Sequence, residues 1–281
     1  MSETGPADGW NGDEAKHWVT EADRYDGQLA PFGELLFDRI QLAANETVLD
    51  VGCRGCGATT IGAARLSAAA VGIDLSVPML AVGKQRAHVA GVSNIEFVAD
   101  DAARHQFAAE SFDAIVSRFG VMFFDDPVMA FTNLRHALRV GGRLVFVGWQ
   151  GLEANPWLLI PSVAAAAHVP LPAIGGSGGP GMFSLADRDH LVSVLTGAGF
   201  ADIEFEPVSP VITLGGGGTL DETLEFLLGT GIARALLDGA QPDARQRAIS
   251  AVRVALAEIY EPGRGVALGT GAWLVSALRA R

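Results

Sequence analysis

Residues 48–57 read VLDVGCRGCG, and this stretch decides the fold. Its apolar residues suit a buried strand, Asp50 lies near the end of that strand, and a turn with three glycines follows. Further along, the short apolar run 70–74 also closes on an acid, Asp74. A strand, a glycine loop, a helix and a second strand ending in an acid predict an α/β domain that binds a nucleotide-like ligand.

The glycine spacing bears on which ligand this is. A dinucleotide fingerprint reads G-x-G-x-x-G, whereas Gly52, Gly55 and Gly57 are spaced G-x-x-G-x-G. Asp50 would repel a diphosphate and attract a cation. S-adenosylmethionine carries an ammonium and a sulfonium and no phosphate, and Asp74 can accept hydrogen bonds from its ribose hydroxyls. The alternative is a turn in which the glycines serve only the backbone, but two acids framing the loop favour the ligand site.

Five segments resemble the class I S-adenosylmethionine-dependent methyltransferases in order and spacing. They read VLDVGCRGCGATT, VGIDLS, IEFVADDA, FDAIVSRFGVMFFDDP and LRVGGRLVFVGW, and they look closest to bacterial small-molecule enzymes with a methyltransferase type 11 domain. The resemblance runs from about Trp10 to the C-terminus. It implies that Asp50, Gly52, Gly55 and Gly57 lie on the methionine-binding loop, Asp74 and Leu75 at the ribose, Asp101 and Ala102 at the adenine amino group, and Ser117 at a backbone contact after the fourth strand.

The loop departs from the family pattern D-x-G-C-G-x-G, because Arg54 is an extra residue. Arg54 either displaces the backbone amides that meet the cofactor carboxylate or grips that carboxylate itself, and the sequence leaves both open. Cys53 and Cys56 have the C-x-x-C spacing of redox pairs and zinc sites. They are the only cysteines in the chain and no histidine lies near them in sequence. We therefore expect two small residues beside the cofactor and no metal.

Composition limits the partners. The chain has 281 residues with 32 acidic against 20 basic side chains, a formal net charge of -12. This balance opposes polyanions, so we expect no nucleic acid and no anionic membrane as partner. No apolar run is long enough to cross a bilayer or to act as a signal segment, which predicts a cytoplasmic protein without membrane insertion. A homo-oligomer is compatible with the sequence.

The predicted fold is a Rossmann-like α/β domain. It has a seven-stranded, mostly parallel sheet with helices on both faces and a mainly helical cap built from two insertions. Expected strands are 47–51, 70–74, 95–99, 112–117, 143–149, 201–205 and 272–278, and the resemblance implies that the last runs antiparallel beside the fifth. Ser76 and Asp126 are expected to cap two crossover helices.

The expected divisions follow this pattern. They are an N-terminal helical arm (1–30), the cofactor-binding core (31–150), a first cap insertion (151–186), the core continued (187–214), a second helical insertion (215–266) and the last core strand (267–281). Both insertions contain glycine runs, which also occur in flexible linkers. Their position beside the expected active-site rim favours a cap.

The predicted chemistry is methyl transfer to a small, fairly apolar acceptor, most readily at oxygen. Apolar walls suit this reaction, and the candidates are Phe119, Met122, Phe123, Phe124, Trp149, Trp157, Met182 and Phe183. An alcohol acceptor would need a base, for which His168 in the first insertion and His17 in the arm are the candidates. Two other functions are weighed beside it, a nicotinamide-dependent oxidoreductase and a cofactor-binding protein without turnover.

Overall fold

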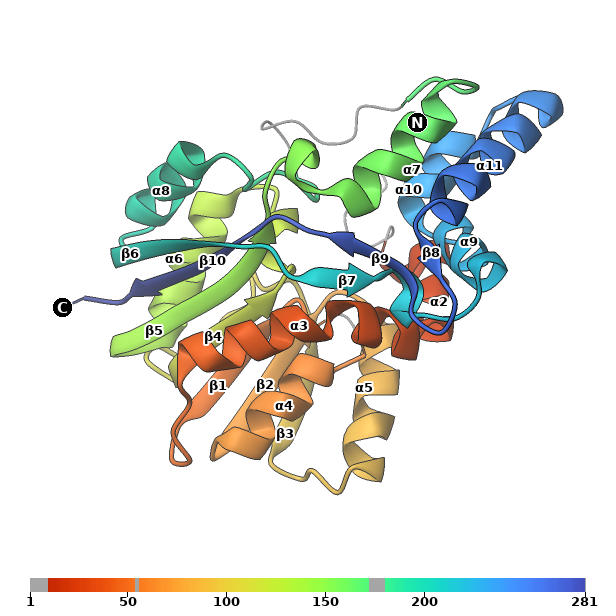
Figure 1. Ribbon diagram of the computed structural model, residues 1–281. Coiled ribbons are helices and arrows are strands. Elements are labelled where there is room, and N and C mark those ends of the chain that lie inside the picture. Colours follow the sequence, from red (N-terminus) through yellow and green to blue (C-terminus); the bar gives the residue numbers. More distant parts are fainter. Residues whose placement is uncertain (1–9, 54–55, 172–179, 281) are drawn as a thin grey trace.

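The computed structural model describes residues 10–53, 56–171 and 180–280. A twisted sheet lies at the centre with helices on both faces, and a group of helices extends from one end (Figure 1). The sheet order is β3-β2-β1-β4-β5-β10-β6. Pairing is parallel from β3 to β5, and β10 runs antiparallel to both of its neighbours. The predicted Rossmann-like fold, with its last strand antiparallel beside the fifth, is confirmed.

All seven predicted strands of this sheet are present. Their bounds are β1 Thr47–Val51, β2 Ala69–Asp74, β3 Ile95–Ala99, β4 Phe112–Arg118, β5 Leu138–Trp149, β6 Ala201–Val208 and β10 Ala272–Leu278. The structure extends β5 by five residues at its start relative to the expected 143–149, and it extends β6 by three residues at its end. Both β5 and β6 pair with β10, which gives the added residues at the end of β6 a hydrogen-bonding neighbour.

Helices cover the sheet on both sides. One face carries α3 Ala22–Ile40, α4 Ala58–Leu66 and α5 Val77–Val89, and the other carries α6 Pro127–Ala137 and α8 Arg188–Gly197 (Figure 1). Asp126 caps α6 as predicted, since its carboxylate accepts from the Met129 backbone N–H. The capping role predicted for Ser76 is wrong. Ser76 occupies the N-cap position of α5, but its hydroxyl makes no capping bond, and its backbone N–H donates to Asp74 instead.

The N-terminal arm packs on the domain through one helical face. Its first helix, α2 Asp13–Thr20, is followed directly by α3. Ala15, Ala22 and Tyr25 are buried, and Trp18 stacks on Tyr25 with ring centroids 3.6 Å apart. Because α3 continues well past residue 30, one unbroken helix joins the arm to the core.

The two insertions supply a helical group at one end of the sheet. Its helices are α7 Pro156–Ala166, α9 Leu220–Leu228, α10 Gly231–Leu237 and α11 Pro242–Ala257. One face of α11 is buried through Val252 and Leu256. A small antiparallel sheet of β7 Val211–Thr213, β9 Gly265–Gly269 and β8 Tyr260–Glu261 was not predicted. The glycine-rich segment 175–179 of the first insertion lies outside the described residues.

α4 packs closely on the sheet at Gly72 of β2. A methyl group there would lie 2.7 Å from the Thr60 hydroxyl and 2.9 Å from the Cys53 sulfur. We expect Gly72→Ala to lower the free energy of unfolding by about 1–3 kcal/mol, the usual effect of overpacking. Gly269→Ala is the control, because no atom lies within 4 Å of the added methyl group. Urea unfolding measures both, and equal stability of the two variants would contradict this packing.

Candidate active site

The candidate site lies at the carboxyl ends of the neighbouring strands β1 and β4. Gly52 has a positive φ of 66°, and a Cβ on it would lie 2.6 Å from the Gly120 Cα. A Cβ on Gly120 would in turn lie 2.4 Å from the Val51 carbonyl oxygen. The Ser117 hydroxyl donates to that same carbonyl at 2.7 Å and accepts from the Gly120 N–H at 3.1 Å. The carboxyl ends of the two strands are therefore held together by backbone contact that only glycine permits.

A pocket opens at these strand ends. Five of the sequence-predicted cofactor residues line it together, namely Gly52, Asp74, Leu75, Asp101 and Ala102. They come from the ends of β1, β2 and β3, which the sequence separates widely. Its remaining wall includes Trp10, Asp100, Arg104, Gly120, Phe123, Phe124 and Met129. The arrangement agrees with the rule that ligands of such sheets bind outside the carboxyl ends of the strands.

Two of the acids that line the pocket, Asp74 and Asp101, are held by backbone amides. Asp74 is buried, and one carboxylate oxygen accepts from the Ser76 N–H at 2.8 Å. Asp101 accepts from the Ala103 N–H at 2.9 Å and is more exposed. These bonds orient each carboxylate toward a fixed position. A hydroxyl-rich or amino-bearing ligand would therefore meet acceptors that are already in place.

Asp50 lies beneath the pocket and is 1% exposed. One of its oxygens accepts from the Thr60 hydroxyl at 2.7 Å, and the other has no hydrogen-bond partner among the described residues. Burial raises the pKa of Asp50 to about 7, although Thr60 and Arg118 act to lower it. An open carboxylate oxygen in a dry site would gain strongly from a cationic ligand.

The glycine loop is described at its two ends only. Gly57 begins α4 with a positive φ of 82°. Gly55 and Arg54 lie outside the described residues, so the two interpretations of Arg54 stay open. Burial raises the pKa of the Cys53 thiol, and it raises that of Cys56 to about 11. Both thiols are held in the unreactive protonated form, as expected for residues that only fill space.

An arginine that the motif analysis passed over lies at the same edge. Arg118 ends β4 with its side chain 6% exposed, and its guanidinium pairs with Asp26 of α3 at 3.1 Å. Asp26 also pairs with Arg86 of α5 at 2.6 Å. Burial raises the pKa of Asp26, while the two arginines act to lower it. Asp50 faces Val116 in the sheet, so Arg118, two residues on, projects from the same face as Asp50.

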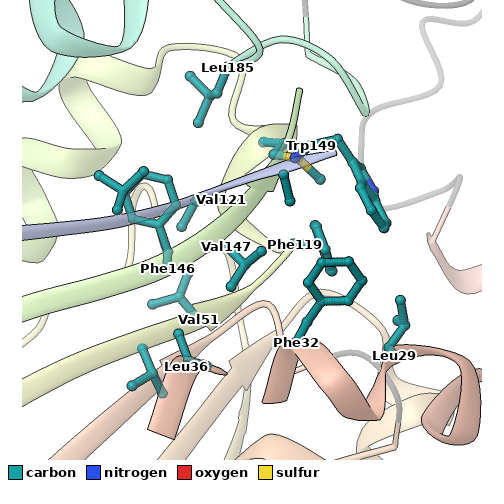
Figure 2. Packing of buried hydrophobic residues seen from close by; sticks show 14 of the residues in the cluster. Leu29, Phe32, Leu36, Val51, Phe119, Val121, Phe146, Val147, Trp149 and Leu185 are labelled. Carbon is teal, nitrogen blue, oxygen red and sulfur yellow. The ribbon is translucent and has the colours of Figure 1, made fainter. Parts of the chain in front are cut away.

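Aromatic rings gather at the ends of β4 and β5. Phe119 stacks on Trp149 with centroids 4.0 Å apart, and Phe32 meets both rings edge-on (Figure 2). Trp157 of α7 adds a fourth ring, 5.1 Å from Trp149. Phe119 has a positive φ of 62°, a strained conformation for a bulky residue that is found mostly at functional sites. Gly120, which follows directly, lines the pocket, whereas the rings of the cluster themselves are buried in the core.

Neither candidate base lies in the pocket. His17 packs between Tyr25 and Phe226, with its Nε2 unpartnered among the described residues, and burial lowers its pKa. His168 lines a different groove, on the outer side of α11. The expectation that His168 points toward the acceptor is therefore not met, because the chain after α7 places it against α11. Sequence position alone indicated only the insertion it belongs to.

Trp10 is the lining residue that sequence reasoning could least have found. Its ring meets Phe123 edge-on at 5.3 Å across the pocket. The next residue, Asn11, donates to the Leu75 carbonyl at 3.0 Å and accepts from the Val77 N–H at 3.1 Å. These bonds carry the start of the arm over the ends of β2 and α5. No periodic pattern in the sequence predicts a contact between segments this far apart in the chain.

Comparison with known proteins agrees with this geometry. A family model described as "Methyltransferase domain" matches residues 49–146. A demethylmenaquinone methyltransferase from Clavibacter sepedonicus is 31% identical over 169 residues, which are 57% of this chain and 68% of the relative. The aklanonic acid methyltransferase DauC from Streptomyces sp. (strain C5) is 34% identical over 119 residues, 41% of this chain and 54% of that protein.

The chain belongs to the class I S-adenosylmethionine-dependent methyltransferases. The crystal structure of the YcgJ protein from Bacillus subtilis shares the fold, with a TM-score of 0.59 and 18% identity over 89% of this chain and 98% of that one. The protein is thus a methyltransferase with S-adenosylmethionine as its cofactor, and the nicotinamide alternative finds no support. No described helix of this methyltransferase has the length and apolar character needed to span a membrane.

Asp74→Asn tests whether Asp74 contacts the ribose of the cofactor. The amide oxygen of Asn can still accept from the Ser76 N–H, but its NH₂ group cannot accept from ribose hydroxyls. We expect near-normal unfolding and an S-adenosylmethionine affinity lower by about 1.5–3 kcal/mol. Calorimetry on this variant and on Asp74→Ala, which also loses the Ser76 bond, separates binding from folding. Unchanged affinity in Asp74→Asn would remove Asp74 from the cofactor site.

Asp50 should make the stability of the free enzyme depend on pH. Its folded-state pKa, about 7, lies above that of an unfolded aspartate, so the folded state binds more protons. Stability should fall as pH rises from about 4 to about 7, by at most about 1.4 kcal/mol per unit. Asp50→Asn keeps an acceptor for Thr60 and should lack this slope. Urea unfolding of the wild type and of Asp50→Asn at several pH values measures this slope. Equal slopes in the two proteins would refute the raised pKa of Asp50.

Proposed function

We propose that this enzyme methylates an oxygen atom of a small, fairly apolar acceptor whose own acidity provides the nucleophile, such as a phenol or a carboxylic acid. The observation that carries the proposal is the pocket lining, where Trp10, Phe123 and Phe124 offer apolar walls and no histidine lies among the described lining residues. The relative DauC, which is named for an acid, supports an acidic acceptor. The relative named for demethylmenaquinone supports a small-molecule acceptor.

The proposed cofactor contacts divide by charge. Asp50 would meet the ammonium group, because its open oxygen is buried and a cation would restore its ionised form. Arg118 would attract the carboxylate from the same face of the sheet, since a guanidinium recognises carboxylates well. Asp74 and Leu75 would hold the ribose, and Asp101 the adenine amino group. The remaining predicted contacts would leave room for the ligand, because Gly52 and Gly57 have no side chain and Ala102 has only a methyl group.

The bound cofactor supplies an electrophilic methyl group on a sulfonium sulfur. The acceptor oxygen would take over that methyl group as its bond to sulfur breaks, and the cofactor would leave as a neutral thioether. Because positive charge on the sulfur disappears in this step, water, which stabilises the charged state, has to be excluded. Trp10, Phe123 and Phe124 of the pocket wall would exclude it, and a flat acceptor could lie in line against these rings.

The divisions of the chain support the same proposal. The insertions 151–186 and 215–266 would form a cap over the acceptor. Trp157 of the first insertion packs against Trp149 at the end of β5, which anchors this part of the proposed cap to the carboxyl end of the sheet. The second insertion reaches the arm, where Arg234 pairs with Glu14 at 2.6 Å. Cap and arm would together close the site during turnover.

The choice of acceptor distinguishes this proposal from base catalysis. We expect S-adenosylhomocysteine to form with phenols or aromatic acids and not with aliphatic alcohols, which keep their proton at neutral pH. His168→Ala and His17→Ala should retain turnover on the acidic acceptor within a few-fold, because neither side chain lines the pocket. Chromatographic measurement of S-adenosylhomocysteine across an acceptor panel provides the test.

Two outcomes would contradict the proposal. Turnover of aliphatic alcohols alone would require a protein base. A loss of about 10²- to 10⁴-fold in His168→Ala, with cofactor affinity unchanged, would identify His168 as that base.

A further inference from the structure

The outer face of α11 carries a long open groove. It is lined by His168, Asp243, Gln246, Arg247, Ser250, Ala251, Val254, Ala255 and Glu258. Val254 lies at its middle and is 63% exposed, an apolar side chain in the open on an otherwise polar surface. Ser250, Ala251 and Ala255 around it are small, so another helix could approach this face closely.

The two ends of the groove carry opposite charges. Arg247 lies toward the start of α11 and Glu258 just after its end. Among the described residues neither takes part in an ion pair, whereas Arg253 of the same helix pairs with Asp221 at 2.9 Å. The two groove charges lie too far apart along the helix to meet each other, since eleven residues span about 16 Å. Each of them can be satisfied by a surface of opposite charge.

We propose that this face is an interface between two copies of the chain, with α11 packed antiparallel against its twofold mate. In a closed dimer the same patch must complement itself. With the axis beside the Val252–Arg253 peptide, Arg247 lies opposite Glu258 of the second copy, and the reciprocal pair forms at the other end. Val254 then lies opposite Ala251 of the second copy. A single register thus matches both charges and places each valine on a small residue.

The expected dimer is weak and leaves the reaction unhindered. One helix pair buries an area at the low end of specific interfaces, so we expect a micromolar dissociation constant. No residue of α11 lines the cofactor pocket, which stays open in the dimer. Interface variants should therefore bind S-adenosylmethionine normally, and this binding also shows that they are folded.

Charge reversal tests the register. Sedimentation equilibrium from about 1 µM to about 1 mM should show a monomer–dimer equilibrium in the wild type. Arg247→Glu and Glu258→Arg each place like charges opposite each other twice per dimer, and each should weaken association about tenfold. The double variant Arg247→Glu/Glu258→Arg restores opposite pairs and should dimerise like the wild type. Arg245→Glu, an exposed residue outside the groove, is the control and should leave association unchanged.

Three results would overturn the proposal. The first is a wild-type protein that stays monomeric over the whole range. The second is a dimer that neither single reversal weakens, because the interface would then lie elsewhere. The third is a double variant as weak as the single variants, because the two charges would then not face each other. S-adenosylmethionine binding in every variant keeps misfolding from imitating any of these results.

Discussion

The contact between Gly52 and Gly120 is the constraint on which the site depends. The backbones approach so closely there that a single added carbon would lie 2.6 Å from the opposite Cα. This contact binds the end of β1 to the turn after β4. Asp50 and Arg118 lie just before these two turns, and the aromatic cluster begins directly after Arg118. A small separation of the strands would therefore disturb the candidate cofactor pocket and the aromatic cluster together.

The charged groups beside the Gly52–Gly120 contact lie in a dry environment, which determines how each of them is stabilised. Asp50 is buried with one oxygen unpartnered among the described residues, which a folded chain normally avoids because burial of an unsatisfied polar group is costly. A functional site can bear that cost when a ligand later supplies the partner. Arg118 is stabilised differently, since Asp26 already neutralises it, and Asp26 is shared with Arg86. At this edge of the sheet, the free enzyme thus holds a carboxyl group, that of Asp50, with an unpartnered oxygen among the described residues. Beside it lies a guanidinium, that of Arg118, which is already ion-paired.

The N-terminal arm links the candidate cofactor pocket to the second insertion. Trp10 lies over the pocket, while Arg24 and Gln28 of α3 bond the backbone of Gly215 at the start of the second insertion. Glu14 pairs with Arg234 of the same insertion. Because these contacts lie on the consecutive helices α2 and α3, the arm connects the second insertion with the residue over the candidate cofactor pocket.

The sequence by itself determined the sheet, the cofactor and several residues of the candidate cofactor pocket. These depend on local patterns, because strands of alternating α/β units and the glycine loop of residues 52–57 are specified by nearby residues. The strand-end acids Asp74 and Asp101 come to one pocket because parallel strands present their carboxyl ends at the same edge. No further information was needed to place them together.

Only the tertiary structure decided the long-range contacts. Trp10 over the pocket, Arg118 against Asp26 and the position of His168 on α11 all depend on how segments distant in sequence pack. The small sheet of β7, β8 and β9 has strands too short for periodicity to reveal. Side-chain burial also set the pKa of Asp50, since the sequence shows an acid but not the dry surroundings that raise its pKa. Local pattern specifies backbone elements, whereas packing decides which side chains meet and how they ionise.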